Sequence, residues 1–198
     1  MEDERRFSEA IRRFDEENRR DPHLIFVDGV AQPHELLYAR RLTEWVLQLQ
    51  PDASQPLLLA ARSQHICRWL IPRNSYDMTR AGYLRWRNDL KYLHARKSAE
   101  VLREVGYDEA TITRVVDLNL KKGLGRDQEC QVLEDALCLV TLQYQLAELL
   151  EKTDRDKMVE ILQKTWKKMS DAAKTKALAL PFTAAESALI QKALGISG

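Results

Sequence analysis

Cysteine is scarce in this sequence. Cys67, Cys130 and Cys138 are the only three cysteines among 198 residues, and no two of them have the CxxC spacing. An odd, widely spaced set argues against a disulfide framework and against a zinc knuckle. The pattern is typical of a reducing compartment, so we expect a cytoplasmic location.

Long apolar runs are also missing. The charged N-terminal segment, residues 1–21, contains no apolar stretch of the kind found in secretory signals. The longest apolar runs, such as residues 57–61, fall far short of the roughly 18 residues that a membrane-spanning helix needs. We therefore expect a soluble protein with no membrane partner.

The chain has almost no net charge. Its 31 Lys/Arg and 30 Asp/Glu give a formal charge of +1 at pH 7. Global charge therefore does not indicate a nucleic-acid partner, and only a local cluster of basic residues could do so.

Proline and glycine are few, with six and seven residues, and no proline lies between Pro72 and Pro181. Because proline breaks helix interiors, this stretch permits continuous helices, and its Leu, Ala, Glu, Lys, Arg and Gln favour them. A chain of 198 residues that is 44% hydrophobic suits one core. The sequence predicts an all-α fold, a single-domain helical bundle over residues 1–198 with about eight to ten helices.

Apolar spacing places the helices. Phe7, Ile11 and Phe14 form a helical stripe. Further helices are expected over residues 36–49, 57–70, 81–89, 93–105, 109–122, 128–151 and 154–169, with a last one after the capping-box pattern Thr183-Ala-Ala-Glu186. Only Leu24–Val27 is strand-like, and one short strand makes no sheet. We expect a helical appendage over about residues 152–198.

Four histidines occur in the chain, and three of them fall on expected helices: His34, His65 and His94. Asp135 lies inside the long helix that follows. Imidazole and carboxylate groups are good ligands for divalent first-row metals, and helices can direct such side chains to one point in a bundle core. The other interpretation is that the histidines are satisfied core residues and that Asp135 caps a helix or pairs with a basic side chain.

The order of these residues resembles that of the HD-domain superfamily. The matching segments are His34-Glu-Leu-Leu, Ala60-Ala-Arg-Ser-Gln-His65, the helix that begins at His94, and Leu133-Glu-Asp135-Ala-Leu. The resemblance covers residues 30–150, and Gln64-His65 stands where the family has its His-Asp pair.

What the HD-domain resemblance implies is a metal-dependent phosphohydrolase acting on a nucleotide or a related phosphate ester. One divalent ion (Mn, Fe, Co, Ni or Zn) would be bound by His34, His65, His94 and Asp135. The metal would lower the pKa of a bound water, and Glu134 or Gln64 would orient that water. The chain also resembles an uncharacterised microbial family through the run from Gln64 to Arg73 and the residues Tyr76, Met78-Thr-Arg80, Gly82-Tyr83 and Trp86-Arg87.

A basic and aromatic segment lies beside these motifs. Ten Lys/Arg occur from residue 62 to residue 103, opposed by Asp77, Asp89 and Glu100. Guanidinium groups match phosphate oxygens, and aromatic rings stack on bases. We expect a small anionic ligand that contains phosphate, with RNA as another partner to consider. The candidate residues are Arg68, Arg73, Tyr76, Arg80, Tyr83, Arg87, Lys121 and Lys122.

The sequence is also compatible with other functions. A metal-free HD-like domain could bind an anion or RNA without hydrolysing it, and a structural helical adaptor would use the same arginines in ion pairs. His65-Ile-Cys-Arg and Lys168-Met-Ser-Asp faintly resemble the signatures of class I aminoacyl-tRNA synthetases. Those signatures require a parallel nucleotide-binding sheet. The sequence has no alternating strand and helix pattern, so we reject a synthetase.

Overall fold

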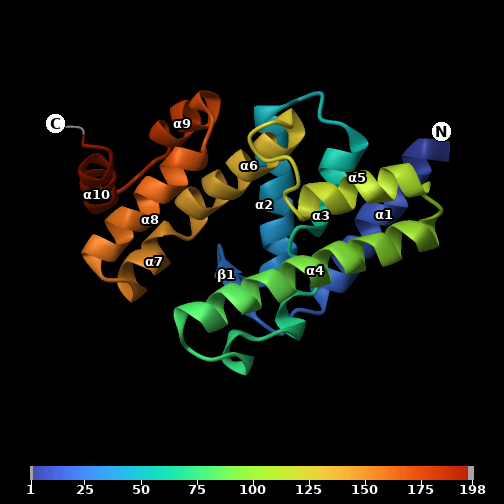
Figure 1. Ribbon diagram of the computed structural model, residues 1–198, viewed down its shortest axis with the longest axis horizontal. Helices are drawn as coiled ribbons and strands as arrows, with labels where there is room; N and C mark the ends of the chain where they lie inside the picture. The colour runs from blue at the N-terminus through green and yellow to red at the C-terminus, as the bar shows by residue number, and fades with distance from the viewer. Residues whose placement is uncertain (1, 196–198) are drawn as a thin grey trace.

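A computed structural model describes residues 2–195, and ten α-helices make up most of this range (Figure 1). The all-α prediction is confirmed. In chain order the helices are α1 (Glu2–Arg19), α2 (His34–Leu49), α3 (Gln55–Ser63), α4 (Arg80–Val105), α5 (Glu109–Asn119), α6 (Gln128–Tyr144), α7 (Leu146–Lys152), α8 (Arg155–Lys168), α9 (Asp171–Leu178) and α10 (Ala184–Leu194). No helix within residues 2–195 is long and apolar enough to cross a membrane.

Polar side chains define most of the helix starts. Thr79 accepts a hydrogen bond from the backbone of Gly82 at the start of α4, and Asp127 accepts one from Cys130 at the start of α6. The expected capping box of Thr183 and Glu186 begins α10. These side chains satisfy backbone donors that have no partner inside the helix, so local sequence sets where each helix begins.

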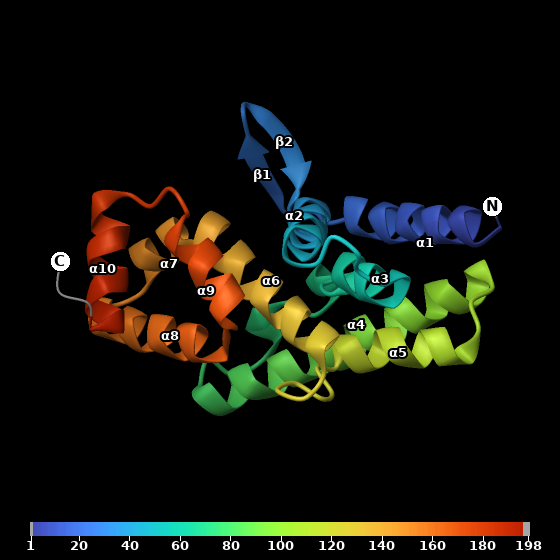
Figure 2. The same ribbon diagram turned by 90° about the horizontal axis from the view of Figure 1, so that it is seen from above.

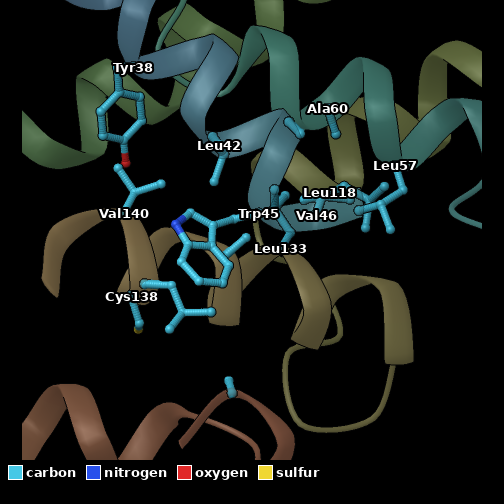
Figure 3. Close-up of a cluster of buried hydrophobic side chains, with 14 of the residues drawn as sticks. Tyr38, Leu42, Trp45, Val46, Leu57, Ala60, Leu118, Leu133, Cys138 and Val140 are labelled. Atoms are coloured by element: carbon cyan, nitrogen blue, oxygen red, sulfur yellow. The ribbon is translucent and has the colours of Figure 1, made fainter. Parts of the chain in front are cut away.

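The core lies where α2, α3, α5 and α6 meet (Figure 3). The fully buried side chains include Leu42 and Val46 of α2, Leu57 of α3 and Leu118 of α5. Leu133 of α6 is 1% exposed. On one side α1 packs across α2, α3 and α4, and α4 runs along α5. On the other side α8 and α9 pack on α6, and α10 packs on α8 (Figure 2). Helix α6 therefore joins the two halves of the molecule.

Four expectations about local structure are wrong. Leu24–Val27 does form a strand, β1, but it pairs antiparallel with an unexpected strand, β2 (Val30–Pro33). Asp28 and Gly29 form the turn with φ of 51° and 78°, the left-handed pair that a two-residue hairpin favours. The expected helices over residues 81–89 and 93–105 are one helix, α4, the expected helix over 57–70 ends at Ser63, and the one over 128–151 breaks after Tyr144.

The segment between α3 and α4 is a compact loop with two short 3₁₀ helices, η1 (Arg68–Leu70) and η2 (Arg73–Ser75). The Arg73 guanidinium donates to the carbonyls of Tyr76 and Asp77 at 3.1 and 2.9 Å. The Trp86 indole of α4 donates to the carbonyl of Ile71 at 2.8 Å. These bonds hold the loop against the first turns of α4.

Gly82 permits this loop to approach α4. A Cβ atom placed on Gly82 would lie 2.1 Å from the carbonyl oxygen of Asp77, a distance that no side chain tolerates. We predict that Gly82→Ala lowers the free energy of unfolding by roughly 1–3 kcal/mol through overpacking, although alanine normally stabilises a helix interior by about 0.5–1 kcal/mol. Chemical denaturation measures the free energy of unfolding, and Asn88→Ala on the exposed part of α4 is the control. A stabilised Gly82→Ala variant would contradict the packing.

Candidate functional site

A buried carboxylate, that of Glu35 in the first turn of α2, lies at the centre of the polar residues in the bundle. Only 4% of Glu35 is exposed. His34 Nδ1 lies 3.3 Å and Arg68 Nε lies 3.6 Å from Oε1. His65 Nδ1 lies 3.4 Å from Oε2, at the outer limit of a hydrogen bond. Three nitrogen groups from two segments of the chain therefore surround one carboxylate.

These neighbours keep Glu35 ionised. Burial acts to raise the pKa of Glu35, but His34 and His65 outweigh it and hold the pKa well below its ordinary value. The same contact with Glu35 raises the pKa of His34, against the opposing effect of burial. Glu35 and His34 thus form an ion pair that favours the charged form of both groups.

A second buried carboxylate lies beside Glu35. Asp21, between α1 and the hairpin, is 4% exposed, and its Oδ2 accepts a hydrogen bond from the backbone N–H of Glu35 at 3.0 Å. Its Oδ1 accepts from the backbone of His23 and contacts the His23 ring at 2.9 and 2.8 Å. One ligand-type atom each of Asp21, His34 and Glu35 lies within 4.8 Å of the others. We call these three residues the carboxylate cluster.

His65 and His94 form a second group, which we call the histidine pair. Their ring centroids lie 5.6 Å apart, and the buried Tyr38 ring stacks on His65 at 4.2 Å. His94 Nδ1 lies 2.7 Å from the carbonyl oxygen of Ile66, so Nδ1 carries the proton and Nε2 carries a lone pair. That Nε2 is buried without a hydrogen-bond partner among the described residues. Contact with Glu35 orients His65 in the same way, with Nδ1 toward an acceptor.

Both rings of the histidine pair are neutral at pH 7. Burial lowers the pKa of His65 to about 4, aided by Arg68 and opposed by Glu35. Burial also lowers the pKa of His94 to about 3, and the adjacent His65 lowers it further. Neutral imidazoles with a fixed Nδ1–H present Nε2 as a base or as a metal ligand.

A buried network of hydrogen bonds fixes the backbone at His94. The Asn119 amide of α5 donates to Ser63 Oγ of α3 at 3.1 Å and to Ser98 Oγ of α4 at 2.9 Å. Ser98 in turn donates to the backbone carbonyl of His94. Because all three side chains are buried, their bonds fix α4 relative to α3 and α5, and with it the position of His94.

Basic side chains lie near the histidine pair. Glu134 of α6 is 4% exposed and forms ion pairs with Lys121 and with Lys168, whose Nζ lies 3.5 Å from Oε1. Burial would raise the pKa of Glu134, but these lysines lower it. Arg68 and Lys121 are both close enough to lower the pKa of His65. We call Arg68, Lys121 and Lys168 the cationic rim.

The four predicted metal ligands do not form one set. Within residues 2–195, the only group of three or more ligand-type side chains at metal-binding distance is the carboxylate cluster, which contains His34 but not Asp135. Asp135 Oδ1 accepts hydrogen bonds from the backbone N–H of Ser170 and from the Gln131 amide, both at 2.9 Å. It therefore helps attach the α8–α9 turn to α6. His65 and His94 lie together, next to Glu35 rather than Asp135.

The other predicted site residues divide between the interior and the surface. Gln64 is buried, and its Oε1 has no hydrogen-bond partner among the described residues. Tyr76 donates to Asp89 at 2.7 Å, Lys122 pairs with Asp117, and Arg73 binds loop carbonyls. These three side chains serve the local structure. Arg80, Tyr83 and Arg87 are exposed on α4.

The sequence interpretation missed Asp21, Glu35 and Lys168. Glu35 adjoins His34, and a glutamate in the first turn of a helix normally faces water and the helix dipole. Asp21 precedes an unexpected hairpin. The one signal available was the density of acidic and histidine residues from Asp21 to Glu35, where His23 and His34 flank the strand-like segment.

Comparison with known families identifies the family of this chain. The family model described as a domain of unknown function, DUF4202, matches residues 8–190. No curated protein and no solved structure matches the chain. The predicted membership of an uncharacterised family is confirmed, and the predicted resemblance to the HD-domain superfamily is not.

Asp135→Ala tests whether this residue is structural. The substitution removes the acceptor for the half-buried Ser170 N–H, so we predict a loss of roughly 1–3 kcal/mol in the free energy of unfolding. Asp171→Ala, at the fully exposed neighbouring aspartate, is the control and should change stability little. Thermal and chemical unfolding measure both. An unchanged stability of Asp135→Ala would contradict the role in attaching the turn.

Acid should destabilise the fold through the histidine pair. The pKa values of His65 and His94 in the folded state lie below the value of 6.5 expected when the chain unfolds. Between pH 6.5 and 5 the unfolded chain therefore binds protons that the folded chain does not, and the free energy of unfolding should fall by roughly 1–3 kcal/mol. The raised pKa of His34 adds no pH dependence between pH 6.5 and 5, since the stabilisation that protonated His34 provides is fully present below pH 6.5.

His94→Gln should remove about half of this pH dependence. His23→Gln, at a ring that is 72% exposed, is the control and should retain the wild-type slope. Chemical denaturation at half-unit pH steps gives the measurement. A His94→Gln variant with the full wild-type slope would show that His94 does not resist protonation.

Proposed function

The chain belongs to the DUF4202 family of domains of unknown function, and we propose that it is a metal-dependent hydrolase of a nucleotide or related phosphate ester. The observation that carries this proposal is the histidine pair. Two neutral imidazoles lie 5.6 Å apart, one with a buried Nε2 that lacks a partner among the described residues. His65 adjoins ionised Glu35, and the basic side chains of Arg68 and Lys121 lie near it.

The residues present fit a divalent metal ion. Asp21, His34 and Glu35 would hold it, because their donor atoms already lie close together and because Oε2 of Glu35 has no good hydrogen-bond donor. Nitrogen and carboxylate donors suit Mn, Fe, Co, Ni and Zn. Two buried carboxylates face the guanidinium of Arg68 and the ring of His34, so a bound cation would displace the proton that His34 holds beside Glu35. When bound, such an ion supplies a water of lowered pKa and polarises a phosphoryl oxygen.

The remaining roles follow from charge and protonation. Nε2 of His65 and of His94 carries a lone pair at neutral pH, because both rings are neutral there, and it accepts a hydrogen bond from the substrate or from the attacking water. The cationic rim neutralises phosphate oxygens, and Arg68 offers the planar fork that matches two of them. Gln64, buried with a free Oε1, orients a polar group of the substrate. Tyr38, whose pKa is raised by burial and by Glu35, stays protonated and packs against His65.

A metal-free anion-binding domain is the second candidate. One observation favours it: Arg68 lies 3.6 Å from Glu35 and already compensates part of the charge that a metal would neutralise. In this case the cationic rim binds a phosphate group, and the histidine pair donates or accepts hydrogen bonds without chemistry.

Metal content and hydrolysis separate the two candidates. We expect purified protein to bind close to one equivalent of a divalent first-row metal, measured by mass spectrometry of the elements, and to hydrolyse bis(p-nitrophenyl) phosphate or p-nitrophenyl phosphate when that metal is added. Glu35→Gln should weaken metal binding by at least roughly 10- to 100-fold, which is the loss that follows removal of a residue that only orients a ligand. Glu44→Gln, the same change at an exposed site on α2, should behave as wild type.

Two results would contradict this proposal. Wild-type protein with less than a tenth of an equivalent of metal and no hydrolysis with any of the five metals would overturn the hydrolase and leave the binding domain. Metal binding that survives Glu35→Gln and His34→Ala would show that the metal lies elsewhere.

A further inference from the structure

One face of α4 continues from the buried site to the surface. Leu102, Ser98 and His94 follow each other at intervals of four residues and are all buried. The same face continues toward the start of the helix through half-buried Lys91 and then exposed Arg87, Leu84 and Arg80, at helical intervals of three or four residues. Figures 1 and 2 show these first turns of α4 extending beyond α3 and α5. The helix face that carries the buried His94 therefore continues into an exposed part of the same helix.

This exposed face carries uncompensated positive charge. Within the part of the chain that the structure describes, no carboxylate lies within 4.0 Å of the side-chain nitrogens of Arg80, Arg87 or Lys91. Burial lowers the pKa of Lys91, and the nearby positive charges of Lys121, Arg87 and Lys122 lower it further. Like charges that approach one another in this way favour a bound anion. We call Arg80, Arg87 and Lys91 the basic stripe.

The length of the stripe indicates the kind of anion. Arg80 and His94 are 14 residues apart on one helix, about 21 Å at the helical rise of 1.5 Å per residue. A single phosphate group cannot contact both ends of such a surface. A chain of phosphates can, with one phosphate at the histidine pair and others along the stripe.

An aromatic side chain accompanies the charges. Tyr83 on α4, three residues from Arg80 and four from Arg87, is 41% exposed. The Arg87 guanidinium lies over the Tyr83 ring at 5.8 Å. Exposed rings beside cations are the surface that single-stranded nucleic acids use, since bases stack on the rings while the backbone follows the charges. An acidic peptide would use the charges but not the rings.

We propose that the basic stripe of α4 binds a single-stranded nucleic acid and directs one of its phosphates to the histidine pair. This inference rests on the proposed function and specifies its substrate class as an oligonucleotide rather than a mononucleotide. Lys91 and Lys121 contact the phosphates nearest His94. Arg80 and Arg87 contact those farther along the strand.

Binding of fluorescein-labelled twelve-nucleotide oligo(U) and oligo(dT) tests the proposal by fluorescence anisotropy at several salt concentrations. We expect the oligonucleotides to bind at least tenfold more tightly than UMP. Arg80→Ala/Arg87→Ala should weaken oligonucleotide binding about tenfold and reduce the slope of log affinity against log salt by about 1.4, for two lost phosphate contacts on a single strand. The control is Arg155→Ala/Lys157→Ala, an equal charge change at exposed positions of α8, which should leave the affinity unchanged.

Three results would overturn the proposal. Oligonucleotides could bind no better than UMP, the α8 control could lose as much affinity as the α4 variant, or polyglutamate or vesicles of phosphatidylglycerol could bind the stripe as tightly as the oligonucleotides. Failure of the proposed function has a separate signature. Tight, salt-dependent oligonucleotide binding through Arg80 and Arg87 without cleavage of any phosphoester supports the binding surface and contradicts the hydrolase.

Discussion

The interior of this protein is organised around one buried negative charge, the carboxylate of Glu35. Removing an ionised carboxylate from water costs several kcal/mol unless charged or hydrogen-bonding partners replace the water. Here the partners come from two places, His34 beside Glu35 and the turn of His65 and Arg68 after α3. The charge can stay buried only while that turn is folded against the start of α2. The position of the histidine pair therefore depends on the same interaction.

Much of the fold follows from sequence patterns, and the errors have physical causes. Apolar spacing and capping residues predicted most helices, since these signals are local. The hairpin was missed because β2 contains Gln32 and ends at Pro33, although the Asp28-Gly29 turn marks it. The two helices expected over residues 81–105 are one, because charged residues in this region are compatible with an exposed helix. An apolar pattern alone cannot locate a helix that extends past its core.

The candidate site was predicted less well than the fold. His34, His65 and His94 do lie in one region of the bundle, with Tyr38 between the first two. Asp135 does not join them, because an aspartate inside a helix can bind a backbone N–H of a neighbouring turn as readily as a metal. Glu35 could not be distinguished from an ordinary helix glutamate before its burial was known. Burial is a property of the packed chain, and it is what gives these residues their chemistry.

The junction of α6 with the C-terminal helices has a consequence for how such chains can vary in length. Gln131, Glu134 and Asp135 occupy little more than one helical turn, and they bind the carbonyl of Lys168, the amines of Lys121 and Lys168, and the N–H of Ser170. Inserting one residue into α6 ahead of them would rotate all three by about 100° and break every one of these contacts together. An insertion at the exposed Asp28-Gly29 turn would not break several contacts together. Insertions and deletions in this family should therefore accumulate at the hairpin tip and be excluded from this turn of α6.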